Sequence, residues 1–311
     1  MAAPFQTDHH VVPGEVEQPE PKIRIVTAPN AGPMTFTGTR SYIVGRGEVA
    51  VIDPGPDDPA HLRAILAALE PGERVRHILV THSHADHAPL ARGLSRMTGA
   101  PVLAFGPHGA GMRPALAALA RRGGLGGGEG ADRDFAPDIR LAHGQTVEGR
   151  GWALTALHTP GHLSNHLCFV LEDSGAVFTG DHVMGWATTL ISPPDGDLTA
   201  FMDSLRLMQG RADRIYYPGH GAPVQDPAGL VAHILRHRAA REAQIRAALA
   251  EAPDTPAGLV ARIYADVDPA LHRAAARNVL AHLLDLVERG LAEAEGEPGP
   301  GARFRPTPAA V

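Results

Sequence analysis

Four side chains of the kinds that bind transition metals lie within six residues of one another. His82, His84, Asp86 and His87 directly follow the apolar segment 77–80. Imidazole nitrogens and carboxylate oxygens are suitable ligands for Zn²⁺ and similar first-row cations. A polar loop that happens to be rich in histidine is the alternative, and it would be preferred for a single histidine. The metal interpretation therefore depends on further ligands elsewhere in the chain.

Residues of the same kinds recur at three later points. They are His162, Asp181 and His220, and each stands beside a glycine shortly after an apolar run. Functional groups collect at such positions just beyond strands of a rigid scaffold. Any one of them alone is weak evidence, because Gly-His is a common turn dipeptide. The four segments together, in this order, indicate one shared metal-binding site.

Short apolar runs between turn residues predict the strands that position these side chains. Strands are expected at residues 41–45, 49–52, 77–80, 152–157, 167–171, 176–179 and 214–217. Apolar residues at helical spacing predict helices at 59–69 and at 197–208, the second capped by Asp197. The glycine-rich segment 121–130 is expected to be a flexible loop.

The character of the sequence changes near Gln225. Residues 1–21 are rich in proline and acidic side chains and are expected to form a mobile lead-in. Residues 22–225 hold every strand signal and all the candidate ligands, so they are expected to form the catalytic domain. Residues 226–311 carry helix patterns, with starts at Thr255-Pro256 and Asp268-Pro269, and then a hairpin. Helices followed by a hairpin are the layout of a winged-helix unit.

The order of these motifs resembles the metallo-β-lactamase superfamily over roughly residues 42–221, with its motif His-x-His-x-Asp-His present in full. The resemblance implies an α+β fold, a four-layer αβ/βα sandwich with the site at one rim of its two sheets. It implies two divalent metal ions, zinc in the first place, with iron or manganese as alternatives. By the resemblance, His82, His84 and His162 hold the first metal, Asp86, His87 and His220 hold the second, and Asp181 bridges both. Asp53 resembles the family's first motif and is interpreted as orienting a ligand rather than binding metal.

The resemblance further implies that the chain is a hydrolase. Two cations about 3.5 Å apart can share a water and lower its pKa toward neutrality. The resulting hydroxide would attack a carbonyl or phosphoryl centre. Asp86 is the best candidate for orienting the hydroxide and accepting its proton, and the bridging Asp181 is the second catalytic candidate. The segment 184–198 is given equal weight as a lining of the substrate entrance and as a connecting loop.

The C-terminal sequence restricts the kind of hydrolase. Segments 236–242, 263–264 and 278–283 resemble the winged-helix tail of the β-lactamase-like-protein-2 group, which is related to glyoxalase II-type enzymes. That resemblance implies hydrolysis of a thioester, ester or lactone of a small molecule, with cleavage of single-stranded RNA as the alternative. Residues 229–311 hold ten arginines, no lysine and ten acidic residues. Because nucleic-acid-binding modules carry a basic face, this neutral tail favours the small-molecule substrate. The tail is expected to cover the rim of the site or to form a homodimer contact.

Composition restricts partners and location. The formal net charge of −6 predicts no general attraction to nucleic acid or to anionic membranes. There is no run of about 18 apolar residues, so no membrane span is expected. Cys168 is the only cysteine, which excludes an internal disulfide, and it lies in an apolar run as expected of a core residue. The single cysteine and an N-terminus unlike a secretory signal together predict a cytoplasmic protein.

The remaining histidines near these motifs are expected to have structural roles. His158 and His182 stand beside residues that already fill ligand positions, and His166 is expected to pack or to support a ligand. Four others have no partner signals and are interpreted as surface or ordinary structural residues: His61, His77, His108 and His143.

Overall fold

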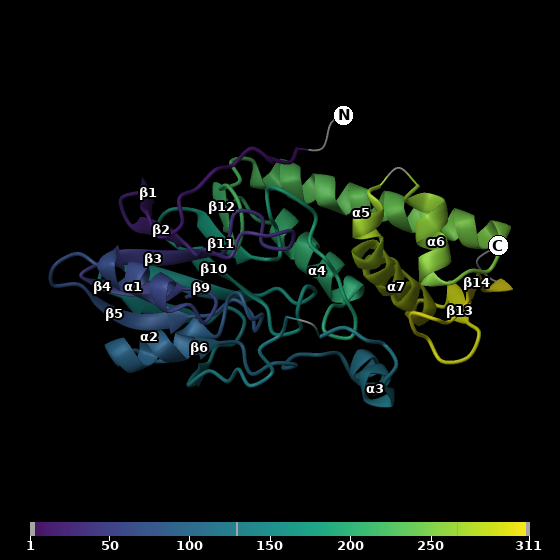
Figure 1. Ribbon diagram of the computed structural model, residues 1–311, viewed down its shortest axis with the longest axis horizontal. Coiled ribbons are helices and arrows are strands. Elements are labelled where there is room, and N and C mark those ends of the chain that lie inside the picture. Colours follow the sequence, from purple (N-terminus) through teal and green to yellow (C-terminus); the bar gives the residue numbers. More distant parts are fainter. Residues whose placement is uncertain (1–3, 129, 266, 309–311) are drawn as a thin grey trace.

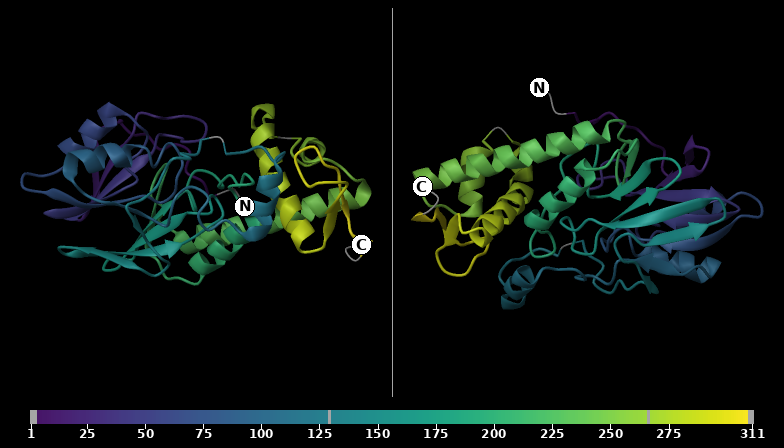
Figure 2. Two further views of the ribbon diagram at one scale, coloured as in Figure 1. Left: turned by 90° about the horizontal axis from the view of Figure 1, so that it is seen from below. Right: turned by 180° about the vertical axis from the view of Figure 1, so that it is seen from behind.

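Two β-sheets face each other and carry helices on their outer sides in the computed structural model, which describes residues 4–128, 130–265 and 267–308 (Figures 1 and 2). Helices α1 (Pro59–Ala67) and α2 (Leu90–Thr98) cover the first sheet, and α4 (Leu198–Gln209) and the first half of α5 (Pro227–Glu251) cover the second. The predicted four-layer αβ/βα sandwich is therefore confirmed.

The first sheet has seven strands in sequence order from β1 to β7. They are β1 (Val16–Glu20), β2 (Ile23–Thr27), β3 (Arg40–Arg46), β4 (Glu48–Ile52), β5 (Arg74–Leu79), β6 (Val102–Ala104) and β7 (Ile139–Arg140). Neighbours from β1 to β4 are antiparallel, and those from β4 to β7 are parallel. Because parallel strands end at the same edge, β4 and β5 deliver Asp53 and the His82 run side by side.

The second sheet has five strands in the order β12-β11-β10-β9-β8. They are β8 (Thr146–Gly149), β9 (Trp152–His158), β10 (Leu167–Leu171), β11 (Ala176–Gly180) and β12 (Ile215–Pro218). Strands β9 and β11 are both antiparallel to β10, and β12 is parallel to β11. The three strands β9, β11 and β12 therefore end at one edge, and the loops that carry His162, Asp181 and His220 leave the sheet there.

Three apolar clusters hold the four layers together. The cluster between the sheets contains Tyr42, Phe169 and Phe178, each at most 2% exposed. The other two clusters lie between each sheet and its helices, with Ile65 of α1 in one and Phe201 of α4 in the other. Cys168 is buried in the cluster beneath α4, as expected of a core residue.

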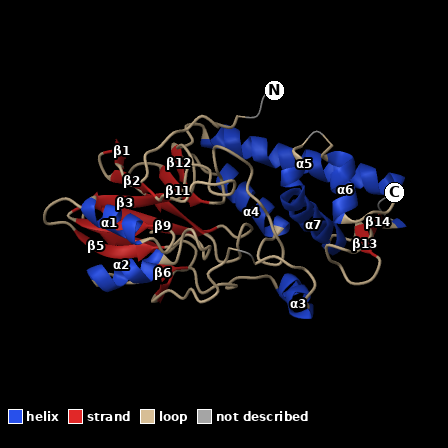
Figure 3. Ribbon diagram, in the orientation of Figure 1, coloured by secondary structure: helices blue, strands red, loops and turns tan. Residues whose placement is uncertain are grey.

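The C-terminal elements form a separate helical unit, seen in yellow-green in Figure 1 and as helices with a small hairpin in Figure 3. The unit contains α6 (Pro256–Ile263), the short 3₁₀ turn η1 (Pro269–Leu271), α7 (His272–Glu288), β13 (Ala292–Ala294) and β14 (Phe304–Pro306). Strands β13 and β14 pair antiparallel, which confirms the predicted hairpin. Helix α3 (Pro114–Arg122) follows β6 and contributes Leu119 to the apolar cluster of this unit.

Helix α5 belongs to both parts of the molecule. Leu230 and Ile234 pack in the cluster beneath α4, whereas Ile245 and Leu249, further along the same 25-residue helix, pack in the C-terminal cluster. The predicted boundary at residues 225–226 therefore stands at the start of a shared helix, and it stays a prediction. Among the described helices, none has both the length and the apolar character needed to cross a membrane.

The predicted mobile lead-in is wrong for residues 16–20, which form strand β1 and pair with β2. Nearer the N-terminus, the ring of Phe5 meets the ring of His233 edge-on at 5.6 Å. Polar side chains and Pro19 concealed this strand, because an edge strand tolerates residues that an inner strand excludes. Residues 1–3 of the lead-in and residues 309–311 of the C-terminal unit lie outside the described residues.

The first half of α5 can be tested as part of the catalytic core. We expect Ile234→Ala to lower the free energy of unfolding by about 2–5 kcal/mol, because it opens a cavity in a fully buried cluster. Ile139→Ala on edge strand β7, where the side chain is 42% exposed, is the control and should change it by less than about 0.5 kcal/mol. Urea denaturation measures both, and equal effects would contradict the assignment.

Candidate metal centre

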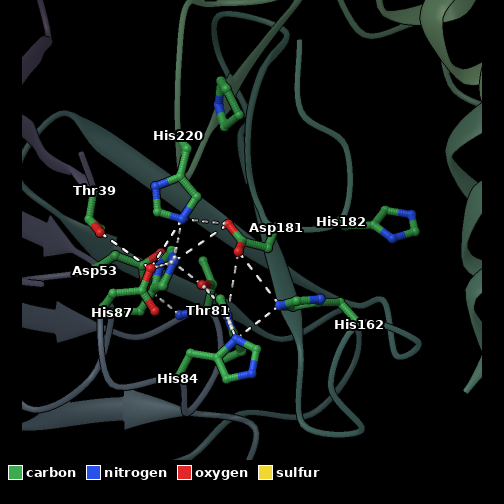
Figure 4. A network of polar contacts seen from close by, with 12 residues as sticks. Thr39, Asp53, Thr81, His84, His87, His162, Asp181, His182 and His220 are labelled. Atoms are coloured by element: carbon green, nitrogen blue, oxygen red, sulfur yellow. Dashed lines mark hydrogen bonds and ion pairs between the residues drawn. The ribbon is translucent and has the colours of Figure 1, made fainter. Parts of the chain in front are cut away.

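The seven predicted ligand residues meet at one edge of the two sheets, as Figure 4 shows for His84, His87, His162, Asp181 and His220. They form two groups whose ligand atoms lie within 4.8 Å of one another: His82, His84, His162 and Asp181 in one, and Asp86, His87 and His220 in the other. The histidines and Asp86 divide as the family resemblance implied for two metals, and Asp181, expected to bridge both, stands in the first group. Tertiary structure therefore brings together every residue of the predicted set, while their role as metal ligands stays a prediction.

In the first group three imidazole nitrogens converge. His84 Nδ1 lies 3.0 Å from His82 Nε2 and 2.9 Å from His162 Nε2. Asp181 Oδ2 closes the group, 3.5 Å from His162 Nε2 and 4.0 Å from His82 Nε2. Three nitrogens and one carboxylate oxygen that face a common point form a donor set suited to a divalent cation such as Zn²⁺.

The second group uses the other oxygen of the same carboxylate. Asp181 Oδ1 lies 3.5 Å from both His87 Nε2 and His220 Nε2. Asp86 Oδ2 lies 3.2 Å from His220 Nε2 and 3.4 Å from His87 Nε2. Asp181 Oδ1 is buried and has no hydrogen-bond partner among the described residues. A buried carboxylate oxygen left without a partner is unfavourable, and a divalent cation at this point would satisfy it. The residues therefore fit a pair of cations.

In three of these histidines the ring nitrogen that faces away from the site forms a hydrogen bond. His87 Nδ1 donates to Asp53 Oδ2 at 2.8 Å, His162 Nδ1 to the Leu190 carbonyl at 2.9 Å and His220 Nδ1 to the Gly38 carbonyl at 3.2 Å. Metal-binding histidines commonly donate their second N–H in this way, which fixes the tautomer and the ring orientation. The lone pair of each Nε2 is thereby directed into the site.

Asp53 lies behind the candidate ligands and contacts one of them, His87. Its Oδ1 accepts from the Thr81 backbone N–H at 2.7 Å, and its Oδ2 accepts from Thr81 Oγ1 at 2.7 Å as well as from His87. The residue has a positive φ of 49°, a conformation that Asp tolerates better than most residues. Asp53 thus connects the end of β4 to the turn after β5. Its carboxylate belongs to neither ligand group.

Burial and neighbouring charges set the protonation of the first group. Burial lowers the pKa of His82 and His162, and it lowers the pKa of His84 to about 3. These three imidazoles are therefore neutral near pH 7, which is the form that binds metal.

The second group behaves differently because it contains carboxylates. Burial opposes protonation of His220, but Asp181 and Asp86 outweigh it and raise its pKa to about 9. The same carboxylates raise the pKa of His87. In turn, although burial disfavours their charge, the histidines hold the pKa of Asp86 and Asp181 below the usual range. The carboxylates are ionised, and cations would replace protons on the two histidines.

The structure places the other histidines outside the ligand groups. His166 Nε2 accepts from the Asp181 backbone N–H at 3.2 Å, so it supports a ligand as expected. His182 points away from the centre, and its ring lies 5.0 Å from that of Phe201 (Figure 4). His61 is a buried structural residue whose Nε2 lies 2.8 Å from Ser41 Oγ, the hydroxyl that donates to the Asp53 carbonyl. No local sequence pattern indicated this link to Asp53.

Two supporting residues, Thr81 and Leu190, were missed by the sequence interpretation. Thr81 directly precedes the histidine run, and that position was the only signal for it. The carbonyl of Leu190 lies in segment 184–198, which was weighed as an entrance lining or a connecting loop, and neither reading included a contact to His162. Backbone carbonyls carry no side-chain signal, so only the tertiary structure reveals such partners. Trp186 of this segment stacks on Phe36, with ring centroids 5.1 Å apart.

Comparison with known families agrees with this architecture. Residues 34–220 match the model of the metallo-beta-lactamase superfamily, and residues 255–301 match that of the beta-lactamase associated winged helix domain. The chain therefore belongs to the metallo-β-lactamase superfamily, and it is a metal-dependent hydrolase with a C-terminal winged-helix domain. The family and the histidine–aspartate cluster imply divalent metal ions at this site.

Individual proteins similar to this chain include named thioesterases and a solved structure. An atrochrysone carboxyl ACP thioesterase from Aspergillus terreus is 33% identical over 250 residues, covering 79% of this chain and 69% of the relative. A protein of the same name from Passalora fulva is 32% identical, covering 80% of this chain and 70% of that one. A beta-lactamase domain protein from Burkholderia ambifaria has the same fold, with a TM-score of 0.79, 23% identity and coverage of 96% and 95%.

The supporting role of Asp53 gives a testable prediction. We expect Asp53→Asn to weaken metal binding by about 10–100-fold, because His87 loses its charged partner. Asp58→Asn, on the same loop, is the matched control. Asp58 caps α1, and Asn caps helices about as well as Asp, so metal affinity should not change. Competition with a chromophoric chelator measures both, and unchanged affinity in Asp53→Asn would contradict the role.

Proposed function

We propose that this protein hydrolyses an acyl thioester at a centre of two divalent cations. The observation that carries the proposal is the Asp181 carboxylate, whose two oxygens face two separate groups of imidazoles. The thioester is favoured over an ester or lactone because relatives that match about four-fifths of this chain are named acyl carrier protein thioesterases. The acyl group would therefore be carried by a small thiol or by a carrier protein.

Each of the two ligand groups would bind one cation. His82, His84 and His162 would hold one cation, Asp86, His87 and His220 the other, and Asp181 both. When bound, the cations supply Lewis acidity that lowers the pKa of a water toward neutrality and polarises the acyl carbonyl. Three neutral imidazoles suit zinc, while the shared carboxylate also admits iron or manganese.

Asp86 is the residue of this chain proposed to handle the proton. Its side chain is 25% exposed, whereas Asp181 is 8% exposed, so Asp86 lies at the solvent side of the centre. Thr39 Oγ1 donates to Asp86 Oδ2 at 3.4 Å and helps to orient it. Asp86 would orient the attacking water and accept its proton. The water oxygen adds to the acyl carbon, the carbon–sulfur bond breaks, and the proton passes to the leaving thiolate.

The ribonuclease alternative has less support in the structure. The arginines of α5 do not form a continuous basic face, because Arg238 is only 3% exposed and the guanidinium of Arg241 lies over the ring of Tyr264, 3.8 Å from its centroid. Other arginines of the C-terminal unit pair with acidic residues, as Arg289 does with Glu242 and Asp285. A module that holds RNA needs a basic face free to meet phosphates.

Removal of single ligands tests the proposed centre. We expect His84→Ala and Asp181→Ala each to lower thioester hydrolysis by at least about 100-fold, because supporting residues alone typically cost 10–100-fold. Release of free thiol from an acyl-coenzyme A or acyl-pantetheine substrate measures the rate. His10→Ala and Asp203→Ala, at exposed positions that belong to neither ligand group, are the matched controls. A ligand variant that retains both its fold and its full rate would refute the mechanism.

Metal removal tests the number of cations. Dialysis against a strong chelator should abolish thioester hydrolysis, and zinc should restore it as binding approaches two ions per chain. Metal analysis of the reconstituted protein and parallel trials with iron and manganese identify the active ion. Full activity with less than one ion per chain would overturn the two-cation proposal. Incubation with single-stranded RNA is the opposing test, and cleavage lost in Asp86→Ala would favour the ribonuclease alternative.

A further inference from the structure

The segment between Asp181 and α4 contacts two of the proposed ligands. Thr189 Oγ1 donates to the Asp181 carbonyl at 2.7 Å and also lies 3.1 Å from the His182 carbonyl. The next residue, Leu190, receives the outward N–H of His162 at 2.9 Å on its carbonyl. Residues 189–191 belong to no helix or strand, so their own backbone ladder does not fix their position.

Two residues of the C-terminal helices hold this segment from the other side. Arg238 of α5 donates through Nη2 to the Thr189 carbonyl. Asn278 of α7 accepts from the Ile191 backbone N–H at 3.0 Å. The two side chains are also joined, since Arg238 Nη1 donates to Asn278 Oδ1 at 3.2 Å. The contacts therefore run without a break from the two helices, through residues 189–191, to His162 and Asp181.

The burial of the Arg238 side chain shows that its charge depends on these hydrogen bonds. It is 3% exposed, and no carboxylate of the described residues forms an ion pair with it. Its guanidinium lies over the ring of Phe201, 5.4 Å from the centroid. A buried charge is unfavourable unless it is paired or hydrogen-bonded. Here the Thr189 carbonyl and the Asn278 side chain accept from the two Nη groups, while Nε has no hydrogen-bond partner among the described residues. Arg238 and residues 189–191 therefore fix each other's positions through these two hydrogen bonds.

We propose that Arg238 and Asn278 are positioning residues of the metal centre, which set the His162 ring and the Asp181 backbone through residues 189–191. The C-terminal domain is then a structural part of the active site. This inference rests on the proposed metal role of His162 and Asp181. Neither positioning residue contacts a ligand side chain directly, so both act only through the intervening segment.

The first test removes the cation. We expect Arg238→Met to weaken Co²⁺ binding by about 10–100-fold and to lower kcat by a similar factor, as loss of residues that orient ligands typically does. KM should change little, because the segment acts on the ligands. The visible spectrum of bound Co²⁺ should also change as the coordination is distorted. Arg238→Lys keeps the positive charge on a single donor nitrogen, which cannot reach both acceptors as the guanidinium does, and should fall between Arg238→Met and the natural protein.

The matched control is Arg241→Met on the same helix. Arg241 also donates to a backbone carbonyl, that of Ile263 at 3.2 Å, and also lies over an aromatic ring, but it has no contact with residues 189–191. Co²⁺ affinity, spectrum and kcat should match those of the natural protein. An equal loss in both variants would show that only general stability is affected and would overturn the proposal.

Asn278 offers a second test that does not depend on Arg238→Met folding. Only its side-chain oxygen is used, as acceptor from Ile191 and Arg238, so Asn278→Asp preserves both contacts and Asn278→Leu removes them. We expect Asn278→Asp to retain Co²⁺ affinity within about twofold and Asn278→Leu to lose 10–100-fold. Because Arg238 and Asn278 share one hydrogen-bond network, the loss of Co²⁺ affinity in the double variant Arg238→Met/Asn278→Leu should be less than the sum of the two single losses in free energy.

The outcomes separate this inference from the proposed function. If the natural protein binds no Co²⁺ at the expected stoichiometry, the metal assignment itself fails. If the natural protein binds Co²⁺ and hydrolyses thioesters, but folded Arg238→Met and Asn278→Leu bind and react equally well, only the positioning inference is overturned. Thermal unfolding of each variant establishes that a loss of metal binding is not a loss of fold.

Discussion

The structure depends on one constraint, which is that a single carboxylate must face two groups of imidazoles at once. Asp181 meets it by directing Oδ2 toward His162 and Oδ1 toward His87 and His220, with separations of 3.5 Å. The three histidines arrive on loops of both sheets, so the sheets must be packed in one fixed relation. The large aromatic side chains between the sheets provide this, because a close-packed interior resists small displacements.

Hydrogen bonds behind the candidate ligands orient the imidazole rings. Because the partners lie on loops of both sheets, the ring orientations depend on how the two sheets are aligned. Asp53 ties the end of β4 to Thr81 and His87 on the adjacent β5 loop, while backbone carbonyls hold His162 and His220. These partners come from four separate parts of the chain. The geometry of the candidate ligands is therefore a property of the assembled fold.

The C-terminal domain enters this arrangement through a shared helix and a shared loop. The N-terminal half of α5 packs against the second sheet, and its C-terminal half packs within the helical unit. Arg238 stands between these halves and contacts the segment that receives His162. A domain that sequence alone suggests as a cover or a dimer contact is thus joined to the interior of the catalytic domain. Its neutral charge agrees with such a structural task.

The sequence by itself determined the family and most of the elements, and it singled out the seven candidate ligand residues, because metal-binding residue types at strand ends and apolar periodicity are local signals. It did not reveal β1, whose polar residues and Pro19 conceal an edge strand, or the short strands β6 to β8, which are too brief to show a period. It also did not reveal β2, α2 and α3. The grouping of Asp86, His87 and His220 followed from resemblance, and only the packing of two sheets brings His220 within 3.3 Å of His87. The supports at Leu190, Gly38 and Arg238 were decided by tertiary structure alone, because hydrogen bonds to backbone carbonyls depend on where distant segments meet and leave no pattern in the residues.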